Sequence, residues 1–262
     1  MVGHSMSYDR MMPAIKRPAQ LVSASDDVVP VTLHDLGGPA ARPVFTLDRG
    51  KLSEKGLWGF VPLDPRARSF VRLRAQLLRR MSRSECGRTV AVISPGSGDG
   101  KSFVAVNLAA ALSELYNVCL VDLDFRKAAI GSLVGTPACL GTEALLANEH
   151  RLAEIGCAAP EARLIVLPAQ QSTDATRLLA SSALPAMFEA LRRAPETISI
   201  IDTPPMLDMD DAIIISHHAD AVLLVIEEGH TKAQDVREVL RLISPTPLVG
   251  TVLNRSLAGA ST

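Results

Sequence analysis

The chain has 262 residues, of which 47% are hydrophobic, and its formal net charge is −1. This length allows one large domain or one domain with appendages, and the near-neutral charge gives no sign of a nucleic-acid binder. Aromatic residues make up only 3% of the chain, so the core must be aliphatic, as in a parallel sheet flanked by helices. The sequence has neither a signal-peptide core nor an apolar run of the ~20 residues that span a bilayer, so we expect a cytoplasmic protein.

The first 88 residues precede the regular part of the chain. Residues 1–45 mix Met, Pro, Ser, Asp and Gly without periodicity, which predicts a disordered tail. Residues 46–88 are predicted to be a linker followed by an arginine-rich helix over 65–83. The arginines of this helix are compatible with a solvated face, an interface or a membrane surface. The apolar stripe that predicts the helix consists of Phe70, Leu73, Leu77 and Met81.

From residue 89 the chain alternates short aliphatic strands with helical stretches, which predicts one domain over 89–256 and a short tail over 257–262. This alternation implies right-handed crossovers and an α/β fold with a doubly wound, mostly parallel sheet. The expected strands are 89–94, 118–123, 164–168, 198–202, 221–227 and 248–254. The expected helices are 101–115, 175–193, 209–218 and 231–243.

The stretch "VISPGSGDGKS" places a glycine-rich loop between the first strand and the next helix. Such a loop presents converging backbone N–H groups at a helix N-terminus and so favours phosphate. Lys101 would then reach the β- and γ-phosphates, and the Ser102 hydroxyl would ligate Mg²⁺. The strict motif G-x-x-x-x-G-K-[ST] has glycine where this chain has Pro95, so a glycine-rich turn without a ligand is the alternative.

Carboxylates follow two further predicted strands. Asp122 and Asp124 end the strand in "CLVDLDF", and Asp202 ends the strand in "ISIIDTPP". In a doubly wound sheet, ligands bind beyond the carboxyl ends of the strands, and a phosphate-bound Mg²⁺ needs hard oxygen ligands. A lone Asp after a strand is usually a cap or turn residue, but three beside one phosphate loop predict a site for ATP and Mg²⁺.

The motifs "SPGSGDGKS", "VDLDFRK" and "IDTPP", in this order, resemble those of the bacterial tyrosine kinases (BY-kinases) of exopolysaccharide synthesis. This family is a branch of the MinD/ParA-like P-loop ATPases, and the resemblance covers roughly 64–255. It implies Mg-ATP-dependent transfer of the γ-phosphate to protein tyrosine in capsular or exopolysaccharide production. The catalytic residues it implies are Lys101, Asp122, Asp124 and Asp202, with Ser102, Asp122 and Asp202 at the metal. The nucleotide-binding residues it implies are Gly96, Ser97, Gly98, Asp99, Gly100, Lys101, Ser102, Phe103 and Arg126, with Asn254 at the adenine.

The resemblance also implies partners. These are the cytoplasmic tail of a membrane polysaccharide co-polymerase (Wzz-like) and further copies of the chain. The protein would then lie at the inner membrane, peripherally, through that partner or through the arginine-rich helix. Family members assemble through an E-x-x-R-x-x-R motif, at whose positions this chain has Arg68, Val71 and Arg74. We therefore expect self-association without the family's ring.

Tyrosine is scarce, which leaves a second hypothesis open. The family's tyrosine-rich tail has no counterpart in "NRSLAGAST", and the chain has only two tyrosines, Tyr8 and Tyr116. Tyr116, at a helix end, is expected to be packed, and Tyr8 is a weak candidate acceptor. The alternative function is a kinase-inactive regulatory ATPase that acts as a nucleotide-gated switch on the co-polymerase. A partition or division ATPase is a weaker alternative, because Gly96 replaces the signature lysine of that group.

Overall fold

The computed structural model describes residues 42–83, 87–194 and 196–256. The predicted C-terminal tail, 257–262, and residues 1–41 of the predicted N-terminal tail lie outside the described residues. Residues 42–45 do not belong to a disordered tail: Phe45 N donates to Ala158 O at 2.9 Å, and Ala158 N donates to Pro43 O at 2.9 Å. This short segment lies along the edge of the sheet, because only there are backbone donors and acceptors left for it to use.

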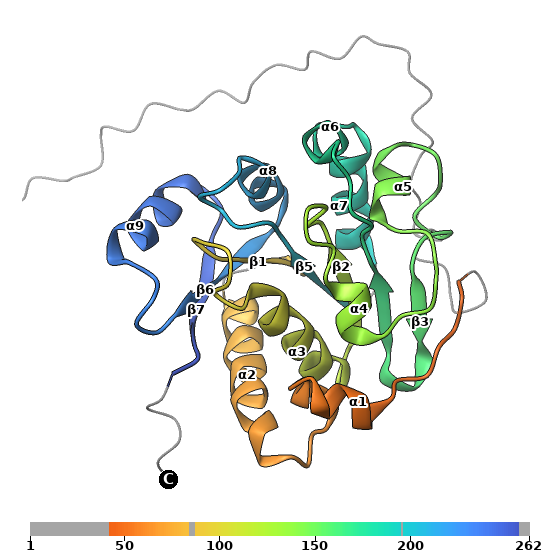
Figure 1. The fold of residues 1–262 in the computed structure, drawn as a ribbon, viewed down its shortest axis with the longest axis horizontal. Helices are drawn as coiled ribbons and strands as arrows, with labels where there is room; N and C mark the ends of the chain where they lie inside the picture. The colour runs from red at the N-terminus through yellow and green to blue at the C-terminus, as the bar shows by residue number, and fades with distance from the viewer. Residues whose placement is uncertain (1–41, 84–86, 195, 257–262) are drawn as a thin grey trace, which may run out of the picture.

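The described part of the chain forms a seven-stranded sheet in the order β3-β4-β2-β5-β1-β6-β7 (Figure 1). The prediction of a doubly wound, mostly parallel sheet is confirmed, since every pairing is parallel except that of β3 with β4. The sequence did not predict β3, which has three residues and none that is β-branched. The strands are β1 Thr89–Ile93, β2 Asn117–Asp122, β3 Cys157–Ala159, β4 Leu164–Leu167, β5 Thr197–Asp202, β6 Ala221–Glu227 and β7 Leu248–Asn254.

Helices cover both faces of the sheet, and each face has its own aliphatic core. On one face lie α1 Arg49–Glu54, α2 Arg68–Arg83, α3 Lys101–Ser113 and α4 Ile130–Val134. On the other lie α5 Thr142–Leu146, α6 Ala175–Leu179, α7 Ala183–Arg193, α8 Asp211–His218 and α9 Ala233–Leu242. The predicted helix 175–193 is interrupted after Leu179, where the sequence "ASS" brings two serines whose side chains compete for backbone hydrogen bonds. None of the helices in these described ranges is long and apolar enough to cross a bilayer.

The arginine-rich helix α2 packs against α3 (Figure 1). Its first residues, 65–67, form a 3₁₀ turn, and Leu77 is buried in the core beneath it. Two of its arginines bind carbonyls of the same chain, since Arg74 Nη1 donates to Ala111 O at 2.7 Å and Arg80 Nη1 to Val249 O at 2.8 Å. The helix therefore uses Arg74 to bind α3 and Arg80 to bind β7, and only its other arginines remain for a solvated face, an interface or a membrane.

Asn107 joins α3 to the segment that precedes α2. It is fully buried, its Oδ1 accepts from Gly59 N at 2.9 Å, and its Nδ2 donates to Phe103 O at 3.0 Å. Asn107→Ala leaves the Gly59 N–H buried without a partner, so we expect a loss of about 1–3 kcal/mol in the free energy of unfolding. Chemical denaturation measures this loss. Asn117→Ala, at the exposed start of β2, is the matched control and should change stability by less than about 0.5 kcal/mol; equal losses in the two variants would contradict the role of Asn107.

Candidate functional site

The loop between β1 and α3 is held in place by hydrogen bonds that centre on Asp99. Asp99 is buried, its Oδ2 accepts from Gly96 N at 3.0 Å, and its Oδ1 accepts from the hydroxyl of Thr231 at 2.9 Å. Its carbonyl accepts from Asn254 Nδ2 at 2.8 Å. Gly100 follows with a φ of 90°, and a Cβ there would lie 2.0 Å from Asn254 Nδ2, so only glycine fits. These contacts fix the backbone at the N-terminus of α3 from one side and leave the opposite side of the loop uncovered.

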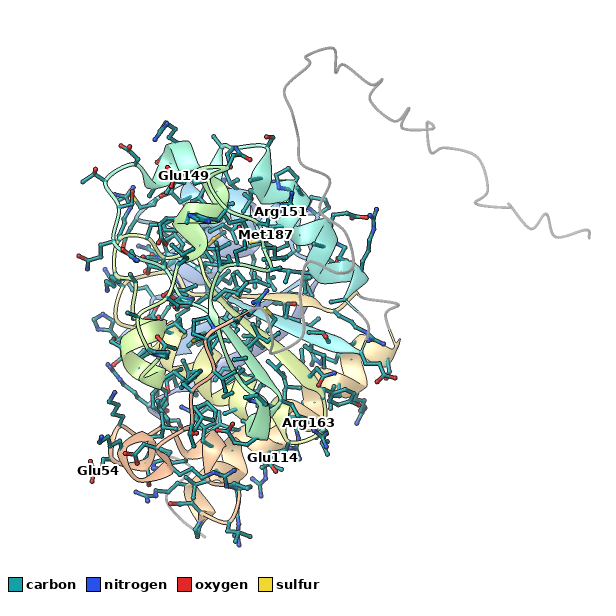
Figure 2. All side chains as sticks on the ribbon, turned by 90° about the vertical axis from the view of Figure 1, so that its right-hand side faces the viewer. Glu54, Glu114, Glu149, Arg151, Arg163 and Met187 are labelled. Carbon is teal, nitrogen blue, oxygen red and sulfur yellow. The ribbon has the colours of Figure 1, made fainter. Side chains whose placement is uncertain are left out.

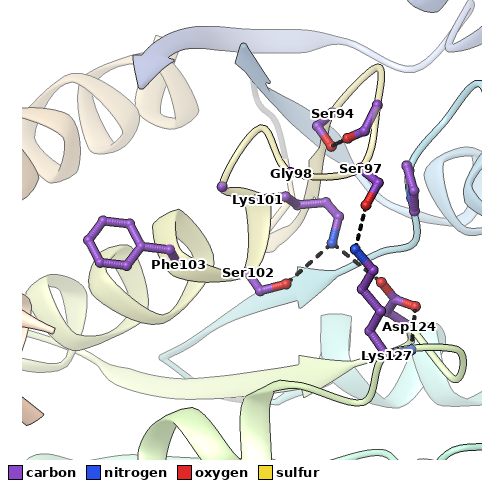
Figure 3. A pocket seen from close by; sticks show the side chains of 11 residues that line it. Ser94, Ser97, Gly98, Lys101, Ser102, Phe103, Asp124 and Lys127 are labelled. Atoms are coloured by element: carbon purple, nitrogen blue, oxygen red, sulfur yellow. Dashed lines mark hydrogen bonds and ion pairs between the residues drawn. The ribbon is translucent and has the colours of Figure 1, made fainter. Parts of the chain in front are cut away.

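Above this loop is a cavity of about 150 Å³ (Figure 3). Lys101 enters it from the first turn of α3, and Lys127 reaches across from the segment after β2 to the hydroxyl of Ser97. Two ammonium groups and the positive end of a helix dipole favour an anion with several negative oxygens. The lining residues are Ser94, Gly96, Ser97, Gly98, Gly100, Lys101, Ser102, Phe103, Asp124, Lys127 and Pro205.

The ammonium group of Lys101 lies among the strand-end carboxylates that the sequence predicted. Its Nζ is 2.8 Å from Asp202 Oδ1, 3.8 Å from Asp124 Oδ2 and 3.4 Å from the hydroxyl of Ser102. Asp202 is fully buried, and its Oδ2 has no hydrogen-bond partner among the described residues. Burial raises the pKa of Asp202, against the opposing effects of Lys101 and the Ser102 hydroxyl. Burying a charged oxygen without a partner costs free energy. A further cation bound at Asp202 Oδ2 would offset this cost.

Asp122 and Asp124 play different structural parts although they are two residues apart. Both oxygens of Asp122 accept backbone N–H groups, from Asp124 at 3.0 Å and from Ile130 at 3.1 Å. Asp122 faces Asp202 across β2 and β5, and neither residue lines the cavity; Asp202 is joined to it only through its contact with Lys101. Burial first, and then the neighbouring charge of Asp202, raises the pKa of Asp122 to about 8. Asp124 lines the cavity and directs Oδ2 toward Lys101, while its Oδ1 accepts from Lys127 N at 3.2 Å.

Three residues that the resemblance assigned to the nucleotide lie outside the cavity lining: Asp99, which supports the loop as described above, Arg126 and Asn254. Arg126 Nη2 lies 3.3 Å from Asp211 Oδ2, at the start of α8. Asn254 supports the loop through the carbonyl of Asp99 and is the last residue of β7. The contact of Asn254 with adenine stays a prediction. Phe103, in the first turn of α3, is part of the cavity lining. Its ring packs edge to face against Trp58 and Phe70, with ring centroids 6.3 and 5.9 Å apart.

Four residues of the site were missed from the sequence, one of which, Ser94, is the residue directly after β1. Lys127 directly follows the acidic motif in "VDLDFRK", so the adjacent basic residue was a usable signal for a second phosphate contact. Pro205 lies in "IDTPP", a motif that supported the family resemblance but from which only Asp202 was assigned to the site. Thr231, which donates to Asp99 and whose hydroxyl accepts from Glu227 N at 2.8 Å, lies 132 residues from Asp99 in the chain. No local pattern marks such a long-range support.

Removing the Asp99 carboxylate is expected to loosen the loop. Asp99→Ala deletes the acceptors of Gly96 N and of Thr231, and hydrogen bonds to a charged group contribute about 1.5–3 kcal/mol each. We expect the free energy of unfolding to fall by about 3–6 kcal/mol and phosphate affinity to fall with it. Thermal unfolding of the variant with and without a nucleotide measures both effects. Asp208→Ala removes an exposed carboxylate from a nearby loop and should leave both unchanged; a similar loss in this control would show that the effect is not local to Asp99.

The donors around the cavity fit a magnesium-bound polyphosphate. The lining supplies Lys101, Lys127, the N–H groups of the loop and the Ser102 hydroxyl. The free Oδ2 of Asp202 belongs to the buried carboxylate that contacts Lys101, just outside the lining. No group of three or more His, Cys, Asp or Glu side chains within the described ranges could hold a metal unaided. Phosphate oxygens would therefore have to complete the coordination, as they do for Mg²⁺. A sheet of this topology with such a loop at its switch point defines a P-loop nucleotide-binding protein.

Comparison with known proteins agrees with that class. Residues 90–256 match the CobQ/CobB/MinD/ParA nucleotide binding domain. The tyrosine-protein kinase CpsD of Streptococcus agalactiae serotype III is 30% identical over 173 residues, which cover 64% of this chain and 74% of CpsD. The succinoglycan biosynthesis transport protein ExoP of Rhizobium meliloti is 27% identical over 265 residues, covering 97% of this chain and 32% of ExoP. The kinase domain of the Escherichia coli tyrosine kinase ETK shares the fold, with a TM-score of 0.71 over 79% of this chain and 82% of that domain at 24% identity.

The chain therefore belongs to the CobQ/CobB/MinD/ParA nucleotide-binding family and, within it, to the bacterial tyrosine kinases.

Proposed function

We propose that the chain binds ATP with Mg²⁺ and transfers the γ-phosphate to protein tyrosine in the control of capsular or exopolysaccharide synthesis and export. The observation that carries the proposal is the position of Lys101. Its ammonium group lies at the base of the phosphate-sized cavity, in contact with Asp202 and near Asp124. Phosphoryl transfer needs little covalent participation from a protein and depends on positioning and on neutralising charge, and these groups supply both.

Each residue of the site has a part in this proposal. The loop N–H groups and Lys101 hold the phosphates, and Lys127 adds a second positive charge from the opposite wall. Ser102 and Asp202 hold the metal, with Asp202 acting through its free Oδ2. Bound magnesium supplies neutralisation of the charge that develops on the phosphate oxygens. Asp124, whose Oδ2 faces the cavity, accepts the proton of the attacking hydroxyl.

Asp122 takes a positioning role in this account, in place of the direct catalytic and metal-binding role that the resemblance implies. Both of its oxygens are already used by backbone N–H groups of the segment 124–130. That segment carries Asp124 and Lys127 into the cavity. Arg126 also has a positioning role, because its contact with Asp211 joins this segment to α8.

The proposed partner is the cytoplasmic tail of a membrane polysaccharide co-polymerase, with further copies of the chain as the oligomer. The likeness to ExoP, a transport protein of succinoglycan biosynthesis, supports a place beside such a component. The protein would then act in the cytoplasm, at the inner membrane.

The second candidate function is that of a kinase-inactive regulatory ATPase, which binds the co-polymerase in only one of its nucleotide-bound states. The scarcity of tyrosine favours it, since the whole chain has only Tyr8 and Tyr116. The two functions differ in what happens to the γ-phosphate. In the first it is transferred to a protein hydroxyl, and in the second it is transferred to water.

Intact mass measured after incubation of the purified chain with Mg-ATP separates these functions, with Lys101→Ala as the control. A kinase gains the mass of a phosphate or phosphorylates an added random copolymer of Glu and Tyr, and the variant does neither. Hydrolysis of ATP without any phosphorylated product would contradict the kinase and favour the regulatory ATPase. Absence of nucleotide binding would contradict both.

A further inference from the structure

Tyr116 is presented to solvent, contrary to the expectation from its sequence position. The residue is 38% exposed, and its neighbours Leu115 and Asn117 are exposed as well. A turn follows the end of α3, and in it Tyr116 N donates a hydrogen bond to Leu112 O at 3.0 Å. The apolar residues of that helix end at Leu112, so the four residues 114–117 lie beyond the core. No hydrogen bond of the Tyr116 hydroxyl occurs within the described residues.

Two arginines share a cavity with this tyrosine. The cavity measures about 460 Å³ and is lined by Arg88, Leu115, Tyr116, Asn117, Arg163 and Glu196. Both guanidinium groups are on exposed residues, and Arg163 Nη1 makes one long hydrogen bond, 3.4 Å, to Leu115 O. Figure 2 labels Arg163 and Glu114 at the same end of the molecule. The charge is positive on balance, because Glu196 is the one acidic residue against two arginines in the lining.

The pair of arginines fits a phosphate better than it fits the neutral phenol. A tyrosine phosphate carries nearly two negative charges and three strong acceptor oxygens. Guanidinium groups bind such oxygens with paired hydrogen bonds. The Arg88 guanidinium makes no hydrogen bond or ion pair within the described ranges, so its donors are available for these oxygens.

We propose that Tyr116 is a phosphorylation site and that Arg88 and Arg163 bind the resulting phosphate. The proposal rests on the proposed kinase function. The phosphate must come from a second copy of the chain, because α3 separates Tyr116 from the phosphate loop of its own copy. That helix has 13 residues, which makes it about 20 Å long at about 1.5 Å per residue. The loop lies at one end of it and Tyr116 just beyond the other.

The transfer balances as an ordinary phosphoryl transfer. The Tyr116 Oη forms a new bond to the γ-phosphorus of ATP held by the donating copy. The bond from that phosphorus to the β-γ bridging oxygen breaks, and ADP leaves. The hydroxyl proton passes to Asp124 of the donating copy and from there to solvent.

Tryptic peptide mapping of the full chain after incubation with Mg-ATP tests the site. The only tyrosine of the peptide 102–126 is Tyr116, and Tyr8 falls in the peptide 1–10. Mixing Lys101→Ala with Tyr116→Phe identifies the donor and the acceptor. In Lys101→Ala trypsin no longer cleaves after residue 101, so its tyrosine lies in the longer peptide 89–126. We expect phosphate on that longer peptide in the mixture and none on it when Lys101→Ala is incubated alone.

The Glu-Tyr copolymer keeps failure of the site distinct from failure of the kinase. If Tyr116→Phe phosphorylates the copolymer but the wild-type chain gains no phosphate on 102–126, the site is wrong and the kinase function stands. If neither is phosphorylated, both proposals are contradicted. Phosphate found only on 1–10 also overturns the site.

The arginines are tested on the phosphorylated chain. In the double variant Arg88→Gln/Arg163→Gln, a tyrosine phosphatase should remove the phosphate from the peptide 102–126 several-fold faster than in the chain with both arginines. Equal rates would contradict the role of the arginines. The Tyr8→Phe variant, which keeps the cavity intact, should match the wild-type rate.

Discussion

Lys101→Ala is expected to abolish ATP hydrolysis and phosphate transfer, with kcat lower by at least about a hundredfold. Removing a preorganised positive donor from a site of developing negative charge costs about 2.7–4 kcal/mol of transition-state stabilisation. In this chain the loss has a second component, because Lys101 is the cation that neutralises the buried Asp202. A steady-state assay of phosphate release with saturating Mg-ATP measures the effect.

The same variant is expected to unfold more easily in the absence of nucleotide. Breaking a buried ion pair by removing one partner costs about 3–5 kcal/mol, since the other charge remains buried alone. Lys127→Ala is the matched control: this lysine reaches the same cavity from an exposed position, so its loss should raise the KM for ATP and leave stability nearly unchanged. A Lys101→Ala protein with wild-type turnover would contradict the site.

Asp202→Asn is expected to reduce kcat by about 10² or more and to raise the Mg²⁺ concentration needed for half-maximal activity. The amide keeps the shape of the carboxylate, but it replaces the charged oxygens, including the unpaired Oδ2, with one oxygen and one N–H donor group. A metal ion contributes several kcal/mol of charge stabilisation, and each 1.36 kcal/mol is a factor of ten in rate. Titrating activity against Mg²⁺ at fixed ATP separates the two effects.

Asp122→Asn is the control for that experiment, because Asp122 faces Asp202 across neighbouring strands. Both of its oxygens bind backbone N–H groups, and an amide can accept only one of these bonds well. This variant should therefore lose stability while its half-saturating Mg²⁺ concentration stays at the wild-type value. If Asp122→Asn shifted the Mg²⁺ dependence and Asp202→Asn did not, the two aspartates would have exchanged roles.

The aliphatic strands of the fold were predictable because each is a short run rich in Val, Ile and Leu, and the central strands β1, β2 and β5 are buried almost throughout. β6 and β7 lie at the residues that the sequence predicted, and the other four expected strands differ by one residue. What escaped prediction is short or depends on distant contacts. β3 has only three residues and forms because its partner strand β4 is already in place.

The site was predictable in its residue types and less so in their roles. Asp122 and Asp124 look alike in "VDLDF", because both follow a buried strand. Only the path of the segment 124–130 determines that Asp122 binds its backbone and Asp124 faces the cavity. Tyr116 shows the same limit: its position at a helix end predicted packing, and the length of the turn that follows α3 decided its exposure.

The central claim is that the loop before Lys101 and the strand-end aspartates form one binding site for a magnesium nucleotide. Calorimetric titration of the full-length chain with ATP, in Mg²⁺ and again in excess EDTA, tests it most directly. We expect one site per chain in Mg²⁺ and an affinity at least about tenfold weaker in EDTA, because Asp202 and Asp124 then repel the phosphates. In Asp202→Asn, where only Asp124 keeps its charge, the difference should be smaller. Equal affinity with and without Mg²⁺ in the wild-type chain, or no binding in either, would contradict the account.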